Sequence, residues 1–409
     1  MISKRFLAQI ERNITIGKAK DGKDITETFG GISVILCGDF HQFPPVATAR
    51  NQALYYESVC SDDQLMQIGR SIYEEFATVV ILRKQMRVTD PIWMEFLTAL
   101  RRGNVEVKHI QMLRSLVLGH RNCPMTNFQQ EPWLSSILIT PRHAVREEWN
   151  TAAIEKHCIR ARTSLFVCDA EDTINGNTLT IEEKYAVALR GHGLTGQRTN
   201  NDLPERIELA VGMSIMITEN LETDLDITNG ARGVIVSIVL HPEEDTSPNL
   251  PITKLHHLPI YILVRLEQTR ADNLVGLETG IVPIVPSNQK MYIKVKIDGV
   301  EKNRTVLRRQ FPITASYAFT DYHSQGQTIK YAIADLGAPA TGSISLFNIY
   351  VALSRVPSRD AIRLLRDFNE DTLLEKSMPI ELDQEDDRLE ALNSNTLAKY
   401  NVVRVSPHL

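Results

Sequence analysis

The feature that most limits the fold is a repeated pairing of a short apolar run with a polar turn. Ile32–Gly38 is rich in β-branched residues and is bounded by glycines, Ser136–Thr140 precedes a proline, and Tyr331–Asp335 ends in an aspartate. Such runs are typical of strands that are buried on both faces of a parallel sheet. Pro91–Arg102 and Leu346–Ser354 have apolar residues at helical spacing. Strands that alternate with helices predict a layered α/β domain.

The pattern changes between about Leu209 and Pro312. Short alternating runs there are separated by loops rich in Pro, Gly and Asn, which indicates a small inserted β-rich module. The predicted strands are Ser214–Thr218, Gly233–Leu240, Ile260–Leu266 and Met291–Ile297. From Asp367 onward, the sequence has ten acidic residues and only four basic ones, which favours a loosely held acidic tail.

Composition excludes several classes of protein. The 409 residues carry a net charge of −5, so no global basic excess points to nucleic acid. Five cysteines, none closer than ten residues to the next, argue against a Cys-x-x-Cys metal site and against a disulfide framework. No apolar run has the length of a membrane span or the pattern of a signal peptide. We therefore expect a soluble protein of a reducing, intracellular compartment, without a membrane partner.

Two segments have the residue types that phosphate chemistry uses. Gly38–Pro45 follows the first predicted strand, where Asp39 and Gln42 can meet a nucleotide's terminal phosphate, its Mg²⁺ or the attacking water. The alternative is a tight strand-to-helix turn. Leu82–Arg87 has three cations in six residues, at the end of a second predicted strand, Thr78–Leu82. Arginine suits a developing phosphoryl charge, but a solvated basic turn is the alternative.

Two later segments complete the set. Thr320–Thr328 offers hydroxyls, amides, a glycine and the ring of Tyr322, which suit a nucleic-acid backbone and its bases. Helix capping by Thr320 and Ser324 is the alternative. Tyr350–Arg355 places an arginine at the end of an apolar helix, where complementing the helix dipole is the alternative to catalysis.

In this order, the four segments resemble the later motifs of the PIF-type superfamily 1B DNA helicases, a family that includes the Helitron helicases and is related to RecD. Gly38–Pro45 resembles GDFxQLPP with Phe43 in place of Leu, and Tyr350–Arg355 matches YVALSR. Thr320–Thr328 resembles TxHKSQGxT, with Tyr322 and His323 at the His and Lys positions. The resemblance extends over about residues 1–368.

The resemblance implies an α/β fold with a partial first RecA-like domain and a second RecA-like (P-loop NTPase) domain that carries an inserted small β-barrel. The implied division is 1–76 for the remnant of the first domain, 77–210 and 313–368 for the second, 211–312 for the barrel and 369–409 for the acidic tail. ATP and Mg²⁺ are the implied cofactors, and single-stranded DNA is the implied partner. The implied location is the nucleus, with the mitochondrion as the alternative. Oligomeric state, DNA substrate and pathway are left open.

The resemblance also implies roles for individual residues. The expected catalytic residues are Asp39, Gln42, Arg87 and Arg355. The expected nucleotide-binding residues are Gly38, Gln42, Arg87, Gly326 and Arg355. The expected DNA-binding residues are Thr320, Tyr322, His323, Ser324 and Gln325. No residue is assigned to a metal.

One part of the family pattern is missing from the sequence. It contains no Gly-Lys-Ser, Gly-Lys-Thr or Asp-Glu, so the family's phosphate loop (Walker A) and acidic pair (Walker B) are absent. Met1–Ser3 resembles the residues that follow the acidic pair, so we expect a helicase that is N-terminally incomplete. The leading interpretation is an ATP-dependent 5′-to-3′ DNA helicase of DNA repair, recombination or a mobile element. The alternatives are a non-catalytic single-stranded-DNA-binding or interaction module, and an unrelated α/β NTPase or scaffold.

Overall fold

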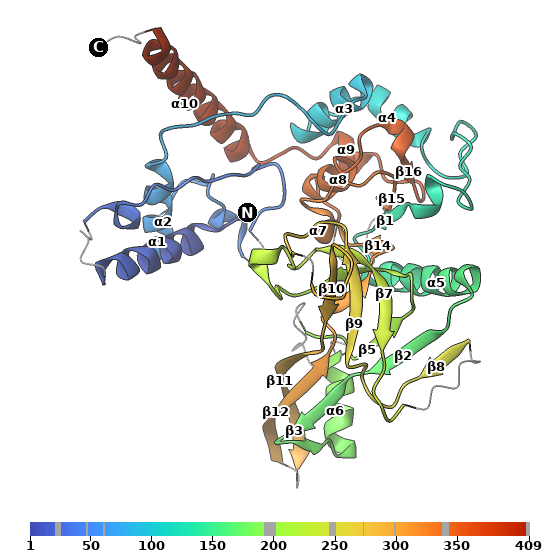
Figure 1. Ribbon diagram of the computed structural model, residues 1–409. Helices are drawn as coiled ribbons and strands as arrows, with labels where there is room; N and C mark the ends of the chain where they lie inside the picture. The colour runs from blue at the N-terminus through green and yellow to red at the C-terminus, as the bar shows by residue number, and fades with distance from the viewer. Residues whose placement is uncertain are drawn as a thin grey trace. The chain divides into compact units, whose positions relative to one another are not determined.

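The computed structural model describes residues 1–20, 26–45, 48–59, 62–191, 202–244, 251–272, 274–297, 300–337 and 343–405. The chain forms two compact units. Met1–Arg142 and Thr320–Leu409 make the first unit, and His143–Phe319 makes the second (Figure 1). The second unit is thus an insertion in the sequence of the first. The five-part division by residue number given above stays a prediction.

The first unit contains helices and strands that frame the predicted motifs. These elements are α1 (Lys4–Ala19), α2 (Gln64–Glu74), α3 (Pro91–Arg101), α4 (Val107–Arg114), β1 (Ile137–Ile139), α7 (Asp321–Ser324), β15 (Ala332–Ala334), α8 (Leu346–Leu353), β16 (Ile362–Leu364), α9 (Asp371–Leu374) and α10 (Ile380–Val405). Short 3-10 turns lie at Thr28–Gly31, Arg50–Gln52, Trp133–Ser135 and Arg359–Ala361.

The N-terminal part of the first unit is built on two helices in close contact. The Ser3 hydroxyl caps α1, and the Asp63 carboxylate caps α2 by accepting the Met66 N–H at 2.9 Å. The helices approach at Gly69, where a Cβ would lie 1.9 Å from the Lys4 carbonyl oxygen. Only glycine permits this approach, which buries Leu7 against the neighbouring apolar side chains.

A parallel sheet forms the centre of the rest of the first unit. β15 lies between β1 and β16, and both pairings are parallel. Every residue of β15 and β16 is buried, as expected for strands covered on both faces. Asp335, just after β15, accepts a hydrogen bond from the Thr140 hydroxyl at 3.0 Å and one from Arg366 Nε at 2.8 Å. The strands predicted at Ser136–Thr140 and Tyr331–Asp335 are confirmed.

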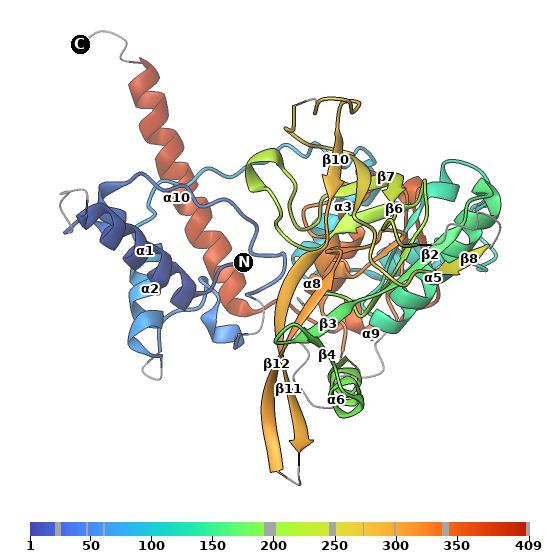
Figure 2. The same ribbon diagram turned by 60° about the horizontal axis from the view of Figure 1, so that its bottom comes forward.

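The second unit is dominated by antiparallel sheets (Figure 2). Its elements are α5 (His143–Ala161), β2 (Leu165–Asp169), β3 (Glu171–Ile174), β4 (Asn177–Thr178), α6 (Ile181–Gly191), β5 (Arg206–Leu209), β6 (Ser214–Ile217), β7 (Arg232–Val239), β8 (Ile252–Lys254), β9 (Tyr261–Leu266), β10 (Ile281–Ile284), β11 (Ser287–Ile297), β12 (Val300–Gln310), β13 (Ile313–Ala315) and β14 (Ala318–Phe319), with a 3-10 turn at Thr223–Leu225.

The order of the five-stranded sheet is β10-β9-β7-β6-β13. Its alternating buried residues form one large apolar cluster with α5 and β2. A long β11–β12 hairpin continues into β3 and β4, and α6 packs on that sheet. The four strands predicted between Leu209 and Pro312 are confirmed, as is the mixed α/β fold class.

Two strand predictions are wrong. Ile32–Gly38 and Thr78–Leu82 form no strand, and apolar side chains in them are exposed, with Ile35 at 85% and Leu82 at 91%. A parallel strand needs a neighbour for its backbone hydrogen bonds, and among the described residues neither run pairs with another strand. In the second run, the Val79 N–H instead donates to the Thr396 hydroxyl at 3.1 Å.

The prediction of a loosely held acidic tail is also wrong. Residues 380–405 form α10, a helix of 26 residues. Its acidic side chains have specific partners in the first unit, because Glu385 accepts the Tyr73 hydroxyl at 2.5 Å and Asp386 contacts His41 Nε2 at 2.9 Å. Burial, followed by the Glu385 carboxylate, raises the pKa of Tyr73. Net charge alone therefore misjudged a segment whose carboxylates are paired.

Cys37, Cys123, Cys158 and Cys168 are free thiols, and Cys60 lies outside the described residues. Burial raises the pKa of Cys168 to about 12. Among the described residues, no helix combines the length and the apolar character needed to cross a membrane.

Candidate functional site

The turn after Gly38 is held by hydrogen bonds of Asp39. Its carboxylate accepts the His41 N–H at 3.1 Å, and its carbonyl accepts the Gln42 N–H at 3.1 Å. The same carboxylate pairs with Arg101 at 3.0 Å, and Arg101 lies 3.5 Å from Asp386. Burial opposes the charge of Arg101, but the two carboxylates outweigh it and raise the pKa of that guanidinium. Asp39 is therefore neutralised by a cation of the chain itself.

The next residues of this turn contact the Thr320–Thr328 segment. Gln325 Nε2 donates to Gln42 Oε1 at 3.1 Å. The rings of Phe43 and Tyr322 are stacked, with centroids 4.2 Å apart and planes inclined by 18°. Two segments that are almost three hundred residues apart, and that were singled out separately in the sequence, thus lie side by side in the first unit.

Arg87 connects the remaining segments. Its Nε donates to the Thr328 hydroxyl at 3.2 Å, and its Nη1 donates to the Ser354 carbonyl at 3.0 Å. Val88, the next residue, is buried. The basic turn is therefore anchored beside the end of α8 and is not simply a solvated loop.

Arg355 lies at the end of α8 with only 2% of its surface exposed. Its Nε donates to the Val351 carbonyl at 2.9 Å, and its Nη2 donates to the Ser354 hydroxyl at 2.7 Å. Burial and the nearby charge of Arg87 lower the pKa of Arg355 to about 10. The buried guanidinium of Arg355 and the partly exposed guanidinium of Arg87 thus repel each other, an arrangement that an anion would relieve.

The Thr320–Thr328 segment uses its hydroxyls internally. Thr320 caps the short helix α7, and its hydroxyl lies 2.8 Å from His323 Nδ1. The Ser324 hydroxyl is fully buried and donates to the Asp321 carbonyl at 2.6 Å. These contacts are those of the capping alternative. Tyr322 is 52% exposed and so offers an aromatic surface in this segment.

The two predicted glycines have different surroundings. Gly326 has a φ of +79° just after α7, so its left-handed backbone requires glycine. A Cβ at Gly38 would meet nothing within 4 Å, and the same holds for Gly326. Neither glycine is therefore required for a close packing contact.

Sequence reasoning missed three residues of this arrangement. Arg101 pairs with Asp39, Asp386 lies 3.5 Å from Arg101, and the Thr328 hydroxyl accepts from Arg87. Arg101 is the last residue of α3, and Asp386 lies on α10, which the charge pattern assigned to a tail. Thr328 belongs to a segment that was singled out, so its motif position was the available signal.

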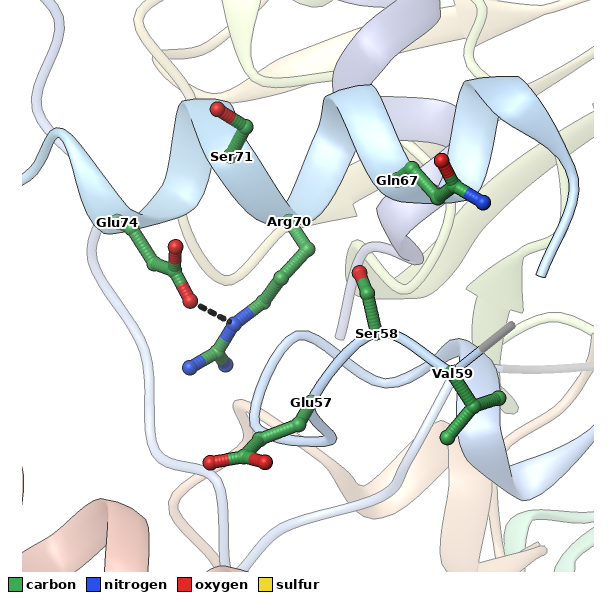
Figure 3. Close-up of a pocket in the computed structure, with 7 residues that line it drawn as sticks. All are labelled: Glu57, Ser58, Val59, Gln67, Arg70, Ser71 and Glu74. Atoms are coloured by element: carbon green, nitrogen blue, oxygen red, sulfur yellow. Dashed lines mark hydrogen bonds and ion pairs between the residues drawn. The ribbon is translucent and has the colours of Figure 1, made fainter. Parts of the chain in front are cut away.

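A pocket in the first unit lies away from these residues (Figure 3). It is lined by Glu57, Ser58, Val59, Gln67, Arg70, Ser71 and Glu74, between α2 and the loop before it. Its one cation is already committed, because Arg70 donates to Glu74 at 2.7 Å and to the Leu54 carbonyl at 2.5 Å. None of the predicted site residues lines this pocket.

Comparison with known proteins supports the resemblance that the four segments carry. A family model described as PIF1-like helicase matches residues 1–109. Over this part, the chain is similar to the PIF1-like helicases. The chain is 23% identical over 374 residues to the ATP-dependent DNA helicase PIF1 of Xenopus laevis. The aligned region covers 90% of this chain and 45% of that relative. The chain thus spans about half the length of the curated relatives it matches.

Solved structures of Pif1 helicases share the fold of this chain. The Pif1 helicase of Candida albicans superposes with a TM-score of 0.57 at 21% identity, over 95% of this chain and 74% of that one. A Bacteroides Pif1 bound to single-stranded DNA superposes with a TM-score of 0.58 at 18% identity, over 95% of this chain and 72% of that one. This likeness supports the RecA-like architecture that the motifs imply.

Proposed function

We propose that this chain is part of an ATP-dependent 5′-to-3′ DNA helicase, and that the Arg87–Arg355 pair senses the terminal phosphate of the nucleotide. The observation that carries the proposal is the pair of mutually repelling guanidinium groups, one of them 2% exposed with its pKa lowered to about 10. Such a pair binds most strongly to a group with several negative charges, and the phosphates of a nucleoside triphosphate form such a group.

The residues present fit the phosphates better than they fit the metal. Arg87 and Arg355 would neutralise charge on the terminal phosphate, and Gln42 would orient groups beside it through its amide. Bound nucleotide supplies the phosphoryl group whose transfer drives movement in helicases. Asp39 already pairs with Arg101, so its carboxylate does not fit a Mg²⁺ ligand, and we assign it to holding the turn.

The proposed link between nucleotide and DNA is the contact of Gln42 with Gln325. A change at the nucleotide would alter this 3.1 Å hydrogen bond and the stack of Phe43 on Tyr322. Gln325 and Tyr322 both lie in the proposed DNA-binding segment. DNA contact would then involve Tyr322, His323 and Gln325 at the surface, while Thr320 and Ser324 shape α7. Stacking on the exposed Tyr322 ring suits single-stranded DNA. A nuclear or mitochondrial location stays a prediction.

Strand displacement tests the proposed function. The chain alone is expected to hydrolyse ATP at background, with or without single-stranded DNA, because its sequence has no phosphate loop. When the segment that precedes the aligned region in a PIF1-like relative is fused before Met1, displacement of a duplex with a 5′ tail should appear, and a 3′ tail should give none. A folded fusion that binds DNA but displaces no strand would favour the non-catalytic alternative.

Binding of single-stranded DNA by the chain alone is expected to be weak, with a shallow dependence on salt. The proposed segment offers mostly neutral groups, so few phosphates are neutralised and few counterions are released. His323→Lys adds a fixed charge and should tighten binding at neutral pH, whereas Gln325→Ala should weaken it. Fluorescence anisotropy at several salt concentrations measures both effects. A steep slope, or indifference to both substitutions, would place DNA elsewhere on the chain.

A further inference from the structure

Three side chains of metal-ligating type lie close together in the second unit. They belong to none of the motifs described above. His241, Glu243 and His257 each have a ligand atom within 4.8 Å of the other two. His257 Nε2 lies 3.5 Å from a Glu243 carboxylate oxygen, and the rings of His241 and His257 have centroids 4.6 Å apart. Among the described residues, this is the one cluster of at least three such groups.

The backbone holds these residues at the ends of neighbouring strands. His241 follows β7, and His257 lies between β8 and β9. β7 and β9 are paired along their length, which fixes the two chain segments beside each other. The Glu244 carboxylate accepts the His257 N–H and further restrains this loop. The side chain of His257 is 42% exposed and that of Glu243 is 73% exposed, so an ion in solution can reach both.

We propose that His241, Glu243 and His257 bind one divalent transition-metal ion, of which Zn²⁺ is the representative. Two imidazoles and one carboxylate suit Zn²⁺ and similar ions, whereas Mg²⁺ and Ca²⁺ prefer oxygen ligands alone. With three protein ligands, a fourth position is left for water.

Binding requires a small local rearrangement. Ligand atoms around tetrahedral Zn²⁺ lie about 3.4 Å apart, given bonds of about 2.1 Å, so the three groups must draw together. The Nδ1 atom of His241 accepts the Glu243 N–H at 3.3 Å. This long, weak bond occupies a lone pair that coordination can use, so the ring gives it up when Nδ1 becomes the ligand.

The bound ion would tie the end of β7 to the segment before β9. It would bind the folded second unit and not the unfolded chain in this geometry, so it would stabilise that unit in proportion to its free concentration. The role assigned here is structural and does not depend on the proposed helicase activity.

Zinc uptake by the full chain tests the proposal. The tag-free protein is first stripped with a chelator, and Zn²⁺ binding is then measured by competition with a chromogenic chelator. One equivalent is expected to bind. His241→Ala and His257→Ala should each weaken that affinity by at least about tenfold, since even loss of a group that only supports a ligand has an effect of this size. Zn²⁺ should raise the unfolding temperature of the unsubstituted chain and should raise it much less in these two variants.

His256→Ala is the matched control, because this exposed neighbour lies outside the cluster. Glu243→Gln removes the anionic ligand from an exposed position with little effect on folding, and should also weaken binding. Unfolding temperatures in chelator show whether each variant is folded. The proposal is contradicted if the unsubstituted chain binds no equivalent of Zn²⁺, or if His256→Ala loses as much affinity as His257→Ala.

Discussion

Arg355→Ala is expected to lower DNA-stimulated ATP hydrolysis by about a thousandfold or more in the fused chain described above, as loss of an arginine that stabilises phosphoryl charge does. Arg355 is buried and lies beside Arg87, so its charge acts where water screens it little. Arg87→Ala should have an effect of similar order. The measurement is the turnover number with saturating single-stranded DNA.

Arg83 provides the matched control. It belongs to the same basic turn but is exposed and pairs with Glu390, so Arg83→Ala should leave turnover nearly unchanged. Because Arg355 also bonds to the Val351 carbonyl and the Ser354 hydroxyl, thermal unfolding must show that the variant is folded. If Arg87→Ala leaves the turnover number unchanged, Arg87 is part of a basic turn and has no catalytic role.

Asp62→Ala is expected to destabilise the N-terminal part of the first unit by about 3–5 kcal/mol. The Lys4 ammonium and the Asp62 carboxylate are 3.0 Å apart, and both side chains are fully buried. Without Asp62, Lys4 would keep only the Glu57 carbonyl, at 3.2 Å, as a partner for its charge. Urea denaturation of the chain measures the loss.

Two further variants separate the charge effect from the packing effect. Lys4→Met combined with Asp62→Leu removes both charges and should recover most of the stability, since a buried pair is often replaceable by apolar groups. Arg5→Ala breaks an exposed pair with Asp63 and should change stability little. If Asp62→Ala is as mild as Arg5→Ala, the buried pair is not formed in solution.

The sequence was sufficient where a local pattern and its neighbours agreed. The strand at Tyr331–Asp335 was predictable because its apolar run and terminal aspartate match a buried parallel strand, and the structure pairs it on both sides. The contact of Gln42 with Gln325 joins two segments that the family resemblance had singled out, although the contact itself was not predicted. Family resemblance therefore identified both segments, and the structure was needed to show their contact.

Sequence reasoning failed where a segment's partner decided its structure. Ile32–Gly38 has every local property of a strand, but strand formation depends on a neighbour to pair with. The acidic residues of α10 looked like a solvated tail, because their partners Tyr73 and His41 lie more than three hundred residues earlier in the chain. Charge counting cannot reveal such a pairing.

The preference of the fused chain for ATP over ADP tests most directly whether the arginine pair senses the terminal phosphate. Calorimetric titration with ADP and with a non-hydrolysable ATP analogue compares two ligands of which only the analogue carries the terminal phosphate group. We expect the unsubstituted chain to bind the ATP analogue more tightly, and a chain with Arg87→Ala and Arg355→Ala to bind both ligands equally. A doubly substituted, folded chain that keeps the full preference would contradict the assignment of these two arginines.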